Sequence, residues 1–311
     1  MTTKVSVVMS VYKDRGRLKE TIQSVTDQTY SDFEFVIIDD ASPDGTLEKL
    51  RQFSKLDNRI TVISNDYNMG LTKSLHRGVA CAKGKYIARI DEGDLWYPEK
   101  LALQVEFLEK KPDYVLVGSQ YLNLCGTTHE ITPGTKLPED FEDVWEWLVG
   151  GKTPFTHPAI LFRAHLLNYN SDATTSQDFE LYLRLGCLGK MANLNLALVE
   201  VLRPFDAISN RQQEIQFFNH LIMHKQFIDA IKTGRQKSFA ERGVDFGKKP
   251  FLFGFRLWYM HFVLKFFGHK KGCVAKKVIK VLFLPDFLFY HLYKRYVFFR
   301  FKKLEGLNDR A

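Results

Sequence analysis

The chain has 311 residues, of which 45% are hydrophobic, so it can bury one large core or two modest ones and is not a disordered chain. Its net charge of +8 is unevenly spread, because residues 248–303 hold 14 of the 44 Lys and Arg residues and a single acid. The rest of the chain is therefore mildly acidic, and the basic end alone predicts an anionic partner, either a membrane surface or a nucleic acid.

The N-terminal segment Met1–Tyr12 alternates like a strand and contains no apolar run with a small-residue cleavage site. We therefore expect no signal peptide and a protein that stays in the cytoplasm. The four cysteines are scattered without the paired spacing of a metal site. A reducing compartment with ordinary thiols is the simplest interpretation.

The first ninety residues alternate between apolar runs typical of strands and amphipathic runs typical of helices. This βαβα order predicts the α/β class, with a Rossmann-like, mainly parallel sheet and helices on both faces. In such sheets, ligands bind beyond the carboxyl ends of the strands. Strands are expected at Val5–Val11, Phe33–Ile38, Ile60–Ser64 and Tyr86–Ile90, and helices at Leu18–Val25, from the turn 39–45 to Phe53, and at Leu71–Ala82.

The second part of the chain is less regular. A helix is expected from Pro98, because proline is tolerated in a first helical turn, to about Glu109. Further elements are expected as a strand near Val115–Gly118, a helix at Phe141–Leu148, an apolar segment at Ala159–Phe162 and a helix at Phe179–Leu185.

Polar clusters follow three of the predicted strands. Ser10 and Tyr12 end the first strand, Asp39 and Asp40 end the second, and residues 91–94 follow the strand at 86–90. Because these strands are expected to be parallel, their ends should converge on one crevice. The first turn is not the glycine-rich turn of a dinucleotide-binding protein, and no Walker-type loop is present. Phosphate binding here would need a metal or basic side chains.

The order of these motifs resembles that of family 2 glycosyltransferases, of the kind found in bacterial polysaccharide and lipopolysaccharide synthesis. The resemblance spans about residues 4–205 and does not cover the last hundred residues. It is more specific than any single motif, because successive blocks match in order. The blocks are Lys4–Tyr12, Gln28–Glu34, Asp39–Ser42, Asn68–Leu71, Ala88–Leu101, His157 and Pro158 with Phe162 and Arg163, and Gln177–Leu185.

The resemblance implies a GT-A fold that holds a nucleotide-diphospho-sugar, with a UDP-sugar expected, and an inverting displacement at the anomeric carbon of the sugar. The base and ribose contacts of the family fall on Ser10, Tyr12 and Asp40, with Asp39 beside it. Carboxylates suit this task because they accept hydrogen bonds from a pyrimidine N–H or a ribose hydroxyl. Taken alone, the same residues are typical of an ordinary strand-to-helix turn.

The acidic cluster corresponds to the DxD-type motif of the family, whose carboxylates hold Mg²⁺ or Mn²⁺ against the diphosphate. The usual pattern would be Asp-x-Asp-Asp, and this chain has Gly93 where the main metal-binding Asp would be. Asp91 and Glu92 carry over as donor-binding residues, and Asp91 also as a metal ligand. The remaining metal role passes to Asp94 or Glu92 or is weakened. A solvated acidic loop is the alternative.

The family's catalytic base falls on Asp178, at the start of the helix on the acceptor side, where it would deprotonate the acceptor hydroxyl. Thr175 and Asp178 also have the spacing of a helix capping box, which is a purely structural alternative. A first-turn position would lower the pKa of Asp178, so a useful base would need burial to raise that pKa. Gln177 replaces the Glu that often precedes this Asp in relatives.

Other polar residues of the matched blocks are weaker candidates. His157, before a proline at an expected strand start, should line the acceptor or sugar pocket, and a structural hydrogen bond is nearly as good an explanation. Arg89 is expected to bind the donor. The other candidate partners of the diphosphate are Lys73, Arg77 and Arg203, each more often a solvated surface charge. The histidine that often follows the last sheet segment in relatives is absent.

The C-terminal segment 251–301 contains 17 aromatic residues among its basic residues. From Asp286, the basic side chains fall largely in one helical sector with an aromatic face opposite, which is typical of a helix lying in a membrane interface. No run of about 18 apolar residues is uninterrupted, so attachment is favoured over crossing. Packing of these aromatics on the catalytic domain is the alternative, and binding to nucleic acid is not expected because no recognised motif is present.

The sequence thus predicts an inverting glycosyltransferase, peripheral on the inner face of the cell membrane, with a lipid-linked or glycan acceptor. Residues 1–120 would form the nucleotide-sugar half, 121–235 the acceptor half, and 236–311 a helical membrane-associating extension whose basic segment 248–303 meets anionic lipid. The rival hypothesis is a non-catalytic subunit that binds nucleotide-sugars as a scaffold, suggested by Gly93 and by the missing histidine.

Overall fold

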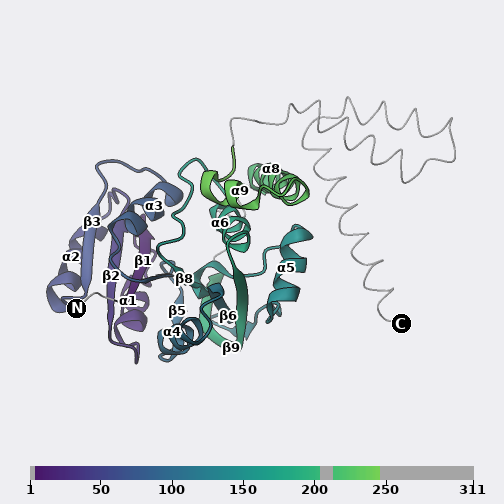
Figure 1. The fold of residues 1–311 in the computed structure, drawn as a ribbon. Coiled ribbons are helices and arrows are strands. Elements are labelled where there is room, and N and C mark those ends of the chain that lie inside the picture. Colours follow the sequence, from purple (N-terminus) through teal and green to yellow (C-terminus); the bar gives the residue numbers. More distant parts are fainter. Residues whose placement is uncertain (1–3, 204–212, 246–311) are drawn as a thin grey trace. The chain divides into compact units, whose positions relative to one another are not determined.

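One sheet organises the part of the chain that the computed structural model describes, residues 4–203 and 213–245 (Figure 1). Its strands lie in the order β3-β2-β1-β4-β8-β6-β9-β5, and β7 pairs with β6 off this path. The strands are β1 (Val5–Val11), β2 (Phe33–Asp39), β3 (Ile60–Ser64), β4 (Tyr86–Arg89), β5 (Leu95–Trp96), β6 (Tyr114–Cys125), β7 (Ile131–Pro133), β8 (Leu161–Arg163) and β9 (Lys190–Arg203).

The sheet is mainly parallel, as the sequence predicted. Strands β3, β2, β1 and β4 pair in parallel, and β6 and β9 pair in parallel with each other. Because β8 is antiparallel to both β4 and β6, these two groups run in the same direction. The short strands β5 and β7 are antiparallel to β9 and β6. The carboxyl ends of β1, β2, β3 and β4 therefore share one edge of the sheet.

Helices cover both faces of the sheet. Along each strand, successive side chains point to opposite faces. In β1, Val7 and Met9 belong to a core cluster with α1, α2 and α4, whereas Val8 belongs to a second cluster with α3, α5, α6, α8 and α9. The helices are α1 (Leu18–Thr26), α2 (Thr46–Leu56), α3 (Leu71–Cys81), α4 (Lys100–Lys110), α5 (Phe141–Val149), the short 3₁₀ helix η1 (His157–Ala159), α6 (Gln177–Gly186), α8 (Gln213–Lys232) and α9 (Gln236–Arg242).

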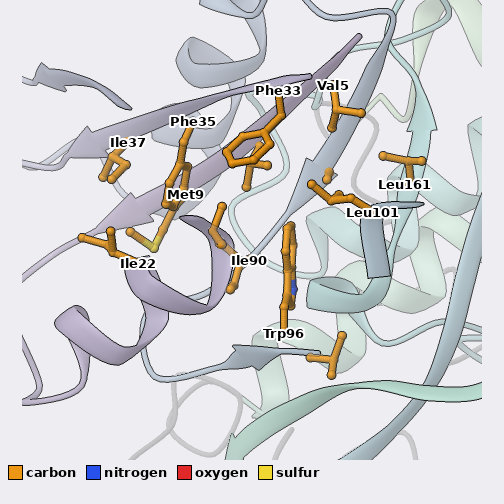
Figure 2. Close-up of a cluster of buried hydrophobic side chains, with 14 of the residues drawn as sticks. Val5, Met9, Ile22, Phe33, Phe35, Ile37, Ile90, Trp96, Leu101 and Leu161 are labelled. Carbon is orange, nitrogen blue, oxygen red and sulfur yellow. The ribbon is translucent and has the colours of Figure 1, made fainter. Parts of the chain in front are cut away.

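The first core cluster fixes the parallel half of the sheet. Figure 2 shows Met9 of β1 and Phe35 of β2 near Ile22 of α1. Trp96 and Leu101 belong to the same buried cluster. All five side chains are at most 4% exposed. At about 1.5–3 kcal/mol for each large apolar side chain fully buried, this packing holds the strand ends, and the loops that follow them, in fixed positions.

Several elements differ from the sequence prediction. Strand β6 continues to Cys125, well past the expected Gly118, because its second half, from Ser119, pairs with Leu194–Arg203 of β9. His157 lies in the 3₁₀ turn η1, not in a strand, and β8 begins only at Leu161. Residue 120 lies inside β6, and the residues up to Phe246 form one compact unit. The division into a nucleotide-sugar half at 1–120 and an acceptor half at 121–235 stays a prediction.

Most of the predicted C-terminal extension, residues 236–311, lies outside the described residues. Of residues 236–311, only α9 and the segment up to Asp245 are described, and they belong to the same compact unit as the residues before them. Among the described residues, no helix is both long and apolar enough to cross a membrane. The aromatic and basic segment 248–303 therefore remains a prediction from sequence.

Candidate active site

The carboxyl edge of β1, β2 and β4 carries the polar residues that the sequence placed there. Ser10 lies opposite Ile38 at the end of β1, and Asp39 is the last residue of β2. Tyr12 follows β1 with 43% of its surface exposed. The backbone N–H of Asp40 donates to the carbonyl of Val11 at 2.8 Å, which ties the ends of the two strands together.

Asp40 holds the loop between β3 and α3. Its Oδ1 accepts hydrogen bonds from the Asn65 side chain at 2.7 Å and the Met69 N–H at 2.8 Å, and its Oδ2 accepts one from the Gly70 N–H at 2.9 Å. Three donors to one buried carboxylate make a rigid anchor. In this structure Asp40 therefore supports the shape of the site rather than presenting an open acceptor to a ligand.

Asp39 differs from its neighbour in this respect. Its Oδ2 accepts long hydrogen bonds from the Ser42 N–H at 3.3 Å and the Ser64 hydroxyl at 3.4 Å. Its Oδ1 is buried and has no hydrogen-bond partner among the described residues. A buried acceptor left unpaired is costly, which makes it a place where an N–H of a ligand would be stabilising.

The loop after β1 is fixed at almost every amide and presents two cations. The Lys13 N–H donates to the Ser42 hydroxyl at 3.0 Å, and the Arg15 N–H donates to Glu92 Oε1 at 3.3 Å. Lys13 has a left-handed φ of +66°, which is unusual for a residue with a side chain. The side chains of Lys13 and Arg15 are exposed at the edge of the site.

Glu92 therefore has a bridging position between the acidic loop and the loop after β1. Its burial raises the pKa of the Glu92 carboxyl, against the Arg15 N–H and charge, which lower it. The residue joins two strand ends and so orders the edge that a donor would occupy.

The acidic loop 91–94 is a tight turn whose third position favours glycine. Gly93 has a φ of +100°, and a Cβ there would lie 2.5 Å from Cδ2 of Leu202 in β9. The Gly93 N–H donates to the Thr21 hydroxyl at 2.9 Å. An Asp at position 93 would therefore be strained and would collide with Leu202.

Asp91 and Asp94 lie close enough for their charges to interact. Burial raises the pKa of Asp94 well above its usual range, and the charge of Asp91 adds to the rise. Asp94 Oδ1 accepts a hydrogen bond from the Leu202 N–H at 2.8 Å. Asp91 is more exposed and forms an ion pair with the buried guanidinium of Arg89.

Asp91 and Asp94 are the two carboxylates that a divalent cation completed by phosphate oxygens would use. Mg²⁺ commonly takes only one or two protein carboxylates when a nucleotide supplies the rest. A cation near Asp91 and Asp94 would relieve the repulsion that raises the pKa of Asp94. The described residues contain no group of three or more His, Cys, Asp or Glu side chains placed to hold a metal without such help.

The charge of Arg89 acts on the acidic loop and on residues of two other elements, η1 and α6. Although burial works against its charge, Asp91 raises the pKa of the Arg89 guanidinium. The positive charge of Arg89 in turn acts on Asp178, the predicted base, and on His157. The structure thus brings Arg89, Asp91, Asp94, His157 and Asp178 into one electrostatic cluster.

Asp178 lies in the first turn of α6. Burial raises the pKa of its carboxyl, and the charge of Asp91 adds to the rise, against the first-turn amides and Arg89, which lower it. No side chain caps α6: Thr175 instead accepts a hydrogen bond from Asn219 of α8 at 2.9 Å, and the N-cap Ser176 has a left-handed φ of +54°. The capping-box alternative is therefore wrong, and the pKa of Asp178 is shifted in the direction that suits a base.

His157, in η1, is buried against two tyrosines that sequence reasoning did not single out. Its Nε2 lies 2.7 Å from the hydroxyl of Tyr169, and burial lowers the pKa of His157 well below its usual range, so the imidazole is neutral. The Tyr182 hydroxyl is buried without a hydrogen-bond partner among the described residues. Tyr182 is four residues after Asp178 and so on the same side of α6, a helical spacing that could have identified it.

Two of the other basic candidates form hydrogen bonds with neighbouring protein groups. Arg77 donates to the carbonyl of Ser64 and to the side chain of Asn65, and so supports the loop held by Asp40. Arg203 donates to Asn123 at 2.8 Å, although its charge still reaches Asp94. Lys73 is an exposed residue of α3. Lys13 and Arg15, which sequence reasoning did not select, are better placed at the strand edge.

A protein-family model described as "Glycosyl transferase family 2" matches residues 6–167. A putative glycosyltransferase of Bacillus subtilis, EpsE, is 34% identical over 235 residues, covering 71% of this chain and 81% of that protein. An uncharacterized glycosyltransferase of Haemophilus influenzae is 33% identical over 208 residues, 63% of this chain and 64% of that protein. The chain thus spans just under two thirds of the Haemophilus protein.

A shorter match joins the chain to a protein with a named reaction. The UDP-Glc:alpha-D-GlcNAc-diphosphoundecaprenol beta-1,3-glucosyltransferase WfgD of Escherichia coli is 34% identical over 106 residues, which cover 34% of this chain and 41% of that protein.

Two solved structures have the same fold. Staphylococcus aureus TarS 1–349 in complex with UDP-GlcNAc superposes with a TM-score of 0.58 at 15% identity, over 84% of this chain and 81% of that one. The Pyrobaculum calidifontis mannosyltransferase PcManGT, in complex with GDP-Man and Mn²⁺, gives a TM-score of 0.52 at 19% identity, over 78% and 69%.

Proposed function

The chain belongs to glycosyl transferase family 2, a family of transferases with the GT-A fold, and we propose that it moves a sugar, with inversion, from a UDP-sugar to a lipid-linked or glycan acceptor. The observation that carries this proposal is the electrostatic cluster in which Arg89 forms an ion pair with Asp91 and its positive charge acts on Asp178. Asp91, just after β4, would belong to the donor side, and Asp178, in the first turn of α6, to the acceptor side.

The base of the donor would meet Asp39. One of its two carboxylate oxygens is already used, and the other is buried and unpaired. A single free acceptor suits the one imide N–H of uracil, whereas guanine would present two adjacent N–H donors. Tyr12, exposed beside it, offers an aromatic face for stacking. Ser10 would complete the nucleoside side.

The diphosphate would lie between the acidic loop and the cations of the edge. Asp91 and Asp94 would hold a Mg²⁺ or Mn²⁺ ion there, which supplies charge neutralisation to the departing nucleotide diphosphate. Lys13 and Arg15 stand on a fixed loop beside Glu92 and would add positive charge from the protein itself. Because position 93 contributes no carboxylate, we expect this ion to be weakly bound in the absence of nucleotide.

The chemical step would begin at Asp178. Its carboxylate accepts the proton of the acceptor hydroxyl as the hydroxyl oxygen attacks the anomeric carbon from the side opposite the diphosphate. The bond between that carbon and the diphosphate oxygen breaks, and UDP leaves with the electron pair. Burial suits this role, because the raised pKa makes Asp178 a stronger base than an exposed carboxylate.

The acceptor side would be formed by His157, Tyr169 and Tyr182. The E. coli relative acts, by its name, on a diphosphoundecaprenol-linked sugar, and a lipid-linked acceptor would be reached by an enzyme bound to the inner face of the membrane. The basic segment 248–303 would supply that attachment, at about 1 kcal/mol for each basic residue near anionic lipid.

A screen of nucleotide-sugars by thermal shift tests the donor, because a ligand that binds only the folded state raises the Tm. Hydrolysis assays with and without Mn²⁺ then test the reaction. Release of UDP from a UDP-sugar supports the enzyme. If the protein binds UDP-sugars but releases no UDP with any metal, the scaffold function, which Gly93 favours, replaces it.

Flotation with vesicles tests the attachment. The full chain should float with vesicles of phosphatidylcholine and phosphatidylglycerol at low salt, and less so at high salt. A chain that ends at Asp245 should stay at the bottom of the gradient. Equal flotation of both chains would contradict the role of residues 248–303.

A further inference from the structure

Helix α8 packs against α6, the helix whose first turn carries Asp178 (Figure 1). Two consecutive residues of α8 reach the start of α6. Asn219 Nδ2 donates a hydrogen bond to the Thr175 hydroxyl at 2.9 Å, just before α6 begins. The ring of His220 stacks on the ring of Phe179, with the ring centres 3.7 Å apart and the planes 11° from parallel. The residue next to the proposed base is therefore covered by a side chain of another helix.

The imidazole of His220 also contacts the end of α5. Its Nε2 lies 2.7 Å from the carbonyl oxygen of Gly151. Because a carbonyl oxygen only accepts hydrogen bonds, Nε2 carries the proton and donates it. Gly151 follows α5 and begins the segment that leads to His157 in η1. His220 therefore connects two parts of the acceptor side, the segment before His157 and the turn that carries Asp178.

The charge state of His220 suits this arrangement. Burial lowers the pKa of His220, against the hydrogen bond to Gly151, which raises it. The imidazole is therefore neutral at about pH 7. Phe179 is only 1% exposed. A neutral ring can pack on this buried side chain without the cost of bringing a charge into the core.

His224 provides an internal comparison, because it resembles His220 in its position and its hydrogen bond. It lies one helical turn later in α8, and its Nε2 donates to the carbonyl of Val149, also at the end of α5, at 2.9 Å. Burial lowers the pKa of His224 as well, against this hydrogen bond. Among the described rings, His220 and not His224 stacks with a ring of α6. The stack is thus the feature that distinguishes the two histidines.

Proton transfer to a base needs accurate placement, and a displacement of about 1 Å can lower a rate by a factor of about 10². We propose that His220 is a positioning residue, whose stack on Phe179 holds the first turn of α6 so that Asp178 meets the acceptor hydroxyl. Asn219 supports the same turn through its hydrogen bond to Thr175. This inference rests on the proposed function for the role of Asp178. The stack and the two hydrogen bonds carry it otherwise.

The experiment compares His220→Ala with His224→Ala in the full chain. Each variant removes one imidazole and one hydrogen bond to the end of α5, and only the first removes the stack. UDP release is measured with the UDP-sugar that gives the largest thermal shift. His220→Ala should lower kcat about tenfold, with the KM for the donor unchanged, because the proposed donor contacts lie on other elements. His224→Ala should keep the kcat and the KM of the wild type.

Two further variants test the stack if His220→Ala is poorly folded. His220→Phe keeps a flat ring but not the hydrogen bond to Gly151, and should retain most of the kcat that His220→Ala loses. Phe179→Leu removes the other ring of the stack and should lower kcat by a similar factor. The double variant of Phe179→Leu and His220→Ala should lose no more than either single variant, because both changes remove one interaction.

Two outcomes would overturn the proposal. One is a kcat of His220→Ala equal to that of His224→Ala, because a purely structural role in packing α8 on α5 would affect both variants alike. The other is a double variant whose loss of kcat is the product of the two single losses, because independent effects multiply.

Hydrogen exchange separates this inference from the proposed function. If no UDP-sugar releases UDP, the proposed function fails, but the first turn of α6 can still be followed by its amides. The Glu180 N–H, which donates to the Ser176 carbonyl at 3.1 Å, should exchange faster in His220→Ala than in His224→Ala or the wild type. Exchange at the same rate in all three proteins would overturn the role of the stack in holding this turn.

Discussion

Gly93 of the acidic loop faces Leu202 of β9 so closely that a Cβ at position 93 would lie 2.5 Å from Cδ2 of Leu202. The side chain of Leu202 therefore occupies the space that a side chain at position 93 would need. The carboxylate that the DxD-type pattern would place there would require a strained φ of +100° and a shift of the Leu202 side chain.

Replacing Gly93 by Asp should weaken the protein without improving its metal site. We expect a loss of about 1–3 kcal/mol of stability from strain and overpacking, with no gain in Mn²⁺ affinity in the presence of UDP. Thermal unfolding and a Mn²⁺ titration measure the two effects. Gly93→Ala is the control for strain without charge, and tighter Mn²⁺ binding by Gly93→Asp would contradict this account.

The adjacent residues Asp39 and Asp40 should respond differently to the same change. Asp39→Asn should raise the Kd for UDP about tenfold or more, because Asn has one acceptor oxygen in place of two and cannot serve both the Ser42 N–H and a ligand N–H, and should change stability little. Asp40→Asn should cost about 1–3 kcal/mol of stability, because the loop at 65–70 loses part of its anchor. Calorimetric titration measures the Kd for UDP, and thermal unfolding measures stability. A loss of stability in Asp39→Asn together with a weakened affinity for UDP in Asp40→Asn alone would contradict the two assignments.

Tyr169 and Tyr182 form a matched pair for removing a buried hydroxyl. The Tyr169 hydroxyl is hydrogen-bonded to His157 at 2.7 Å, whereas that of Tyr182 has no partner in the described chain. Tyr169→Phe should therefore destabilise by about 1–3 kcal/mol, and Tyr182→Phe should leave stability unchanged or slightly raised. A large loss of stability in Tyr182→Phe, measured by denaturant unfolding, would contradict the structure.

The pH dependence of turnover should report Asp178. Because burial raises the pKa of Asp178, the base becomes protonated at a higher pH than an exposed Asp would. As the pH falls, kcat/KM should decline before it reaches the ordinary Asp range near about 4. A rate that stays constant down to that range would show that no group of raised pKa is required in its basic form.

Much of the donor side could be predicted from the sequence, because strands and the turns that follow them are local features. The apolar run Val5–Val11 and the acidic turn after β4 sit where periodicity placed them. That Asp40 is hydrogen-bonded while Asp39 keeps a free oxygen could not be predicted, because this difference depends on Asn65 and Gly70, which approach from another loop.

The acceptor side was less accessible to sequence reasoning for the same reason. Tyr169 lies in an irregular loop and reaches His157 only through the fold. The local spacing of Thr175 and Asp178 favoured a cap, but Asn219 of α8 takes up the Thr175 hydroxyl. Leu202, which packs against Gly93 and so disfavours a side chain at position 93, comes from strand β9. Each of these depends on partners distant in the chain.

The most direct test of the central claim is UDP release and sugar transfer by Asp178→Asn. The variant should bind UDP as the wild type does and lose transfer by a factor of about 10² or more. Because the ionised form of Asp178 is disfavoured by burial, its Tm at neutral pH should be no lower than that of the wild type. Transfer by Asp178→Asn at the wild-type rate would contradict the assignment of this residue as the base.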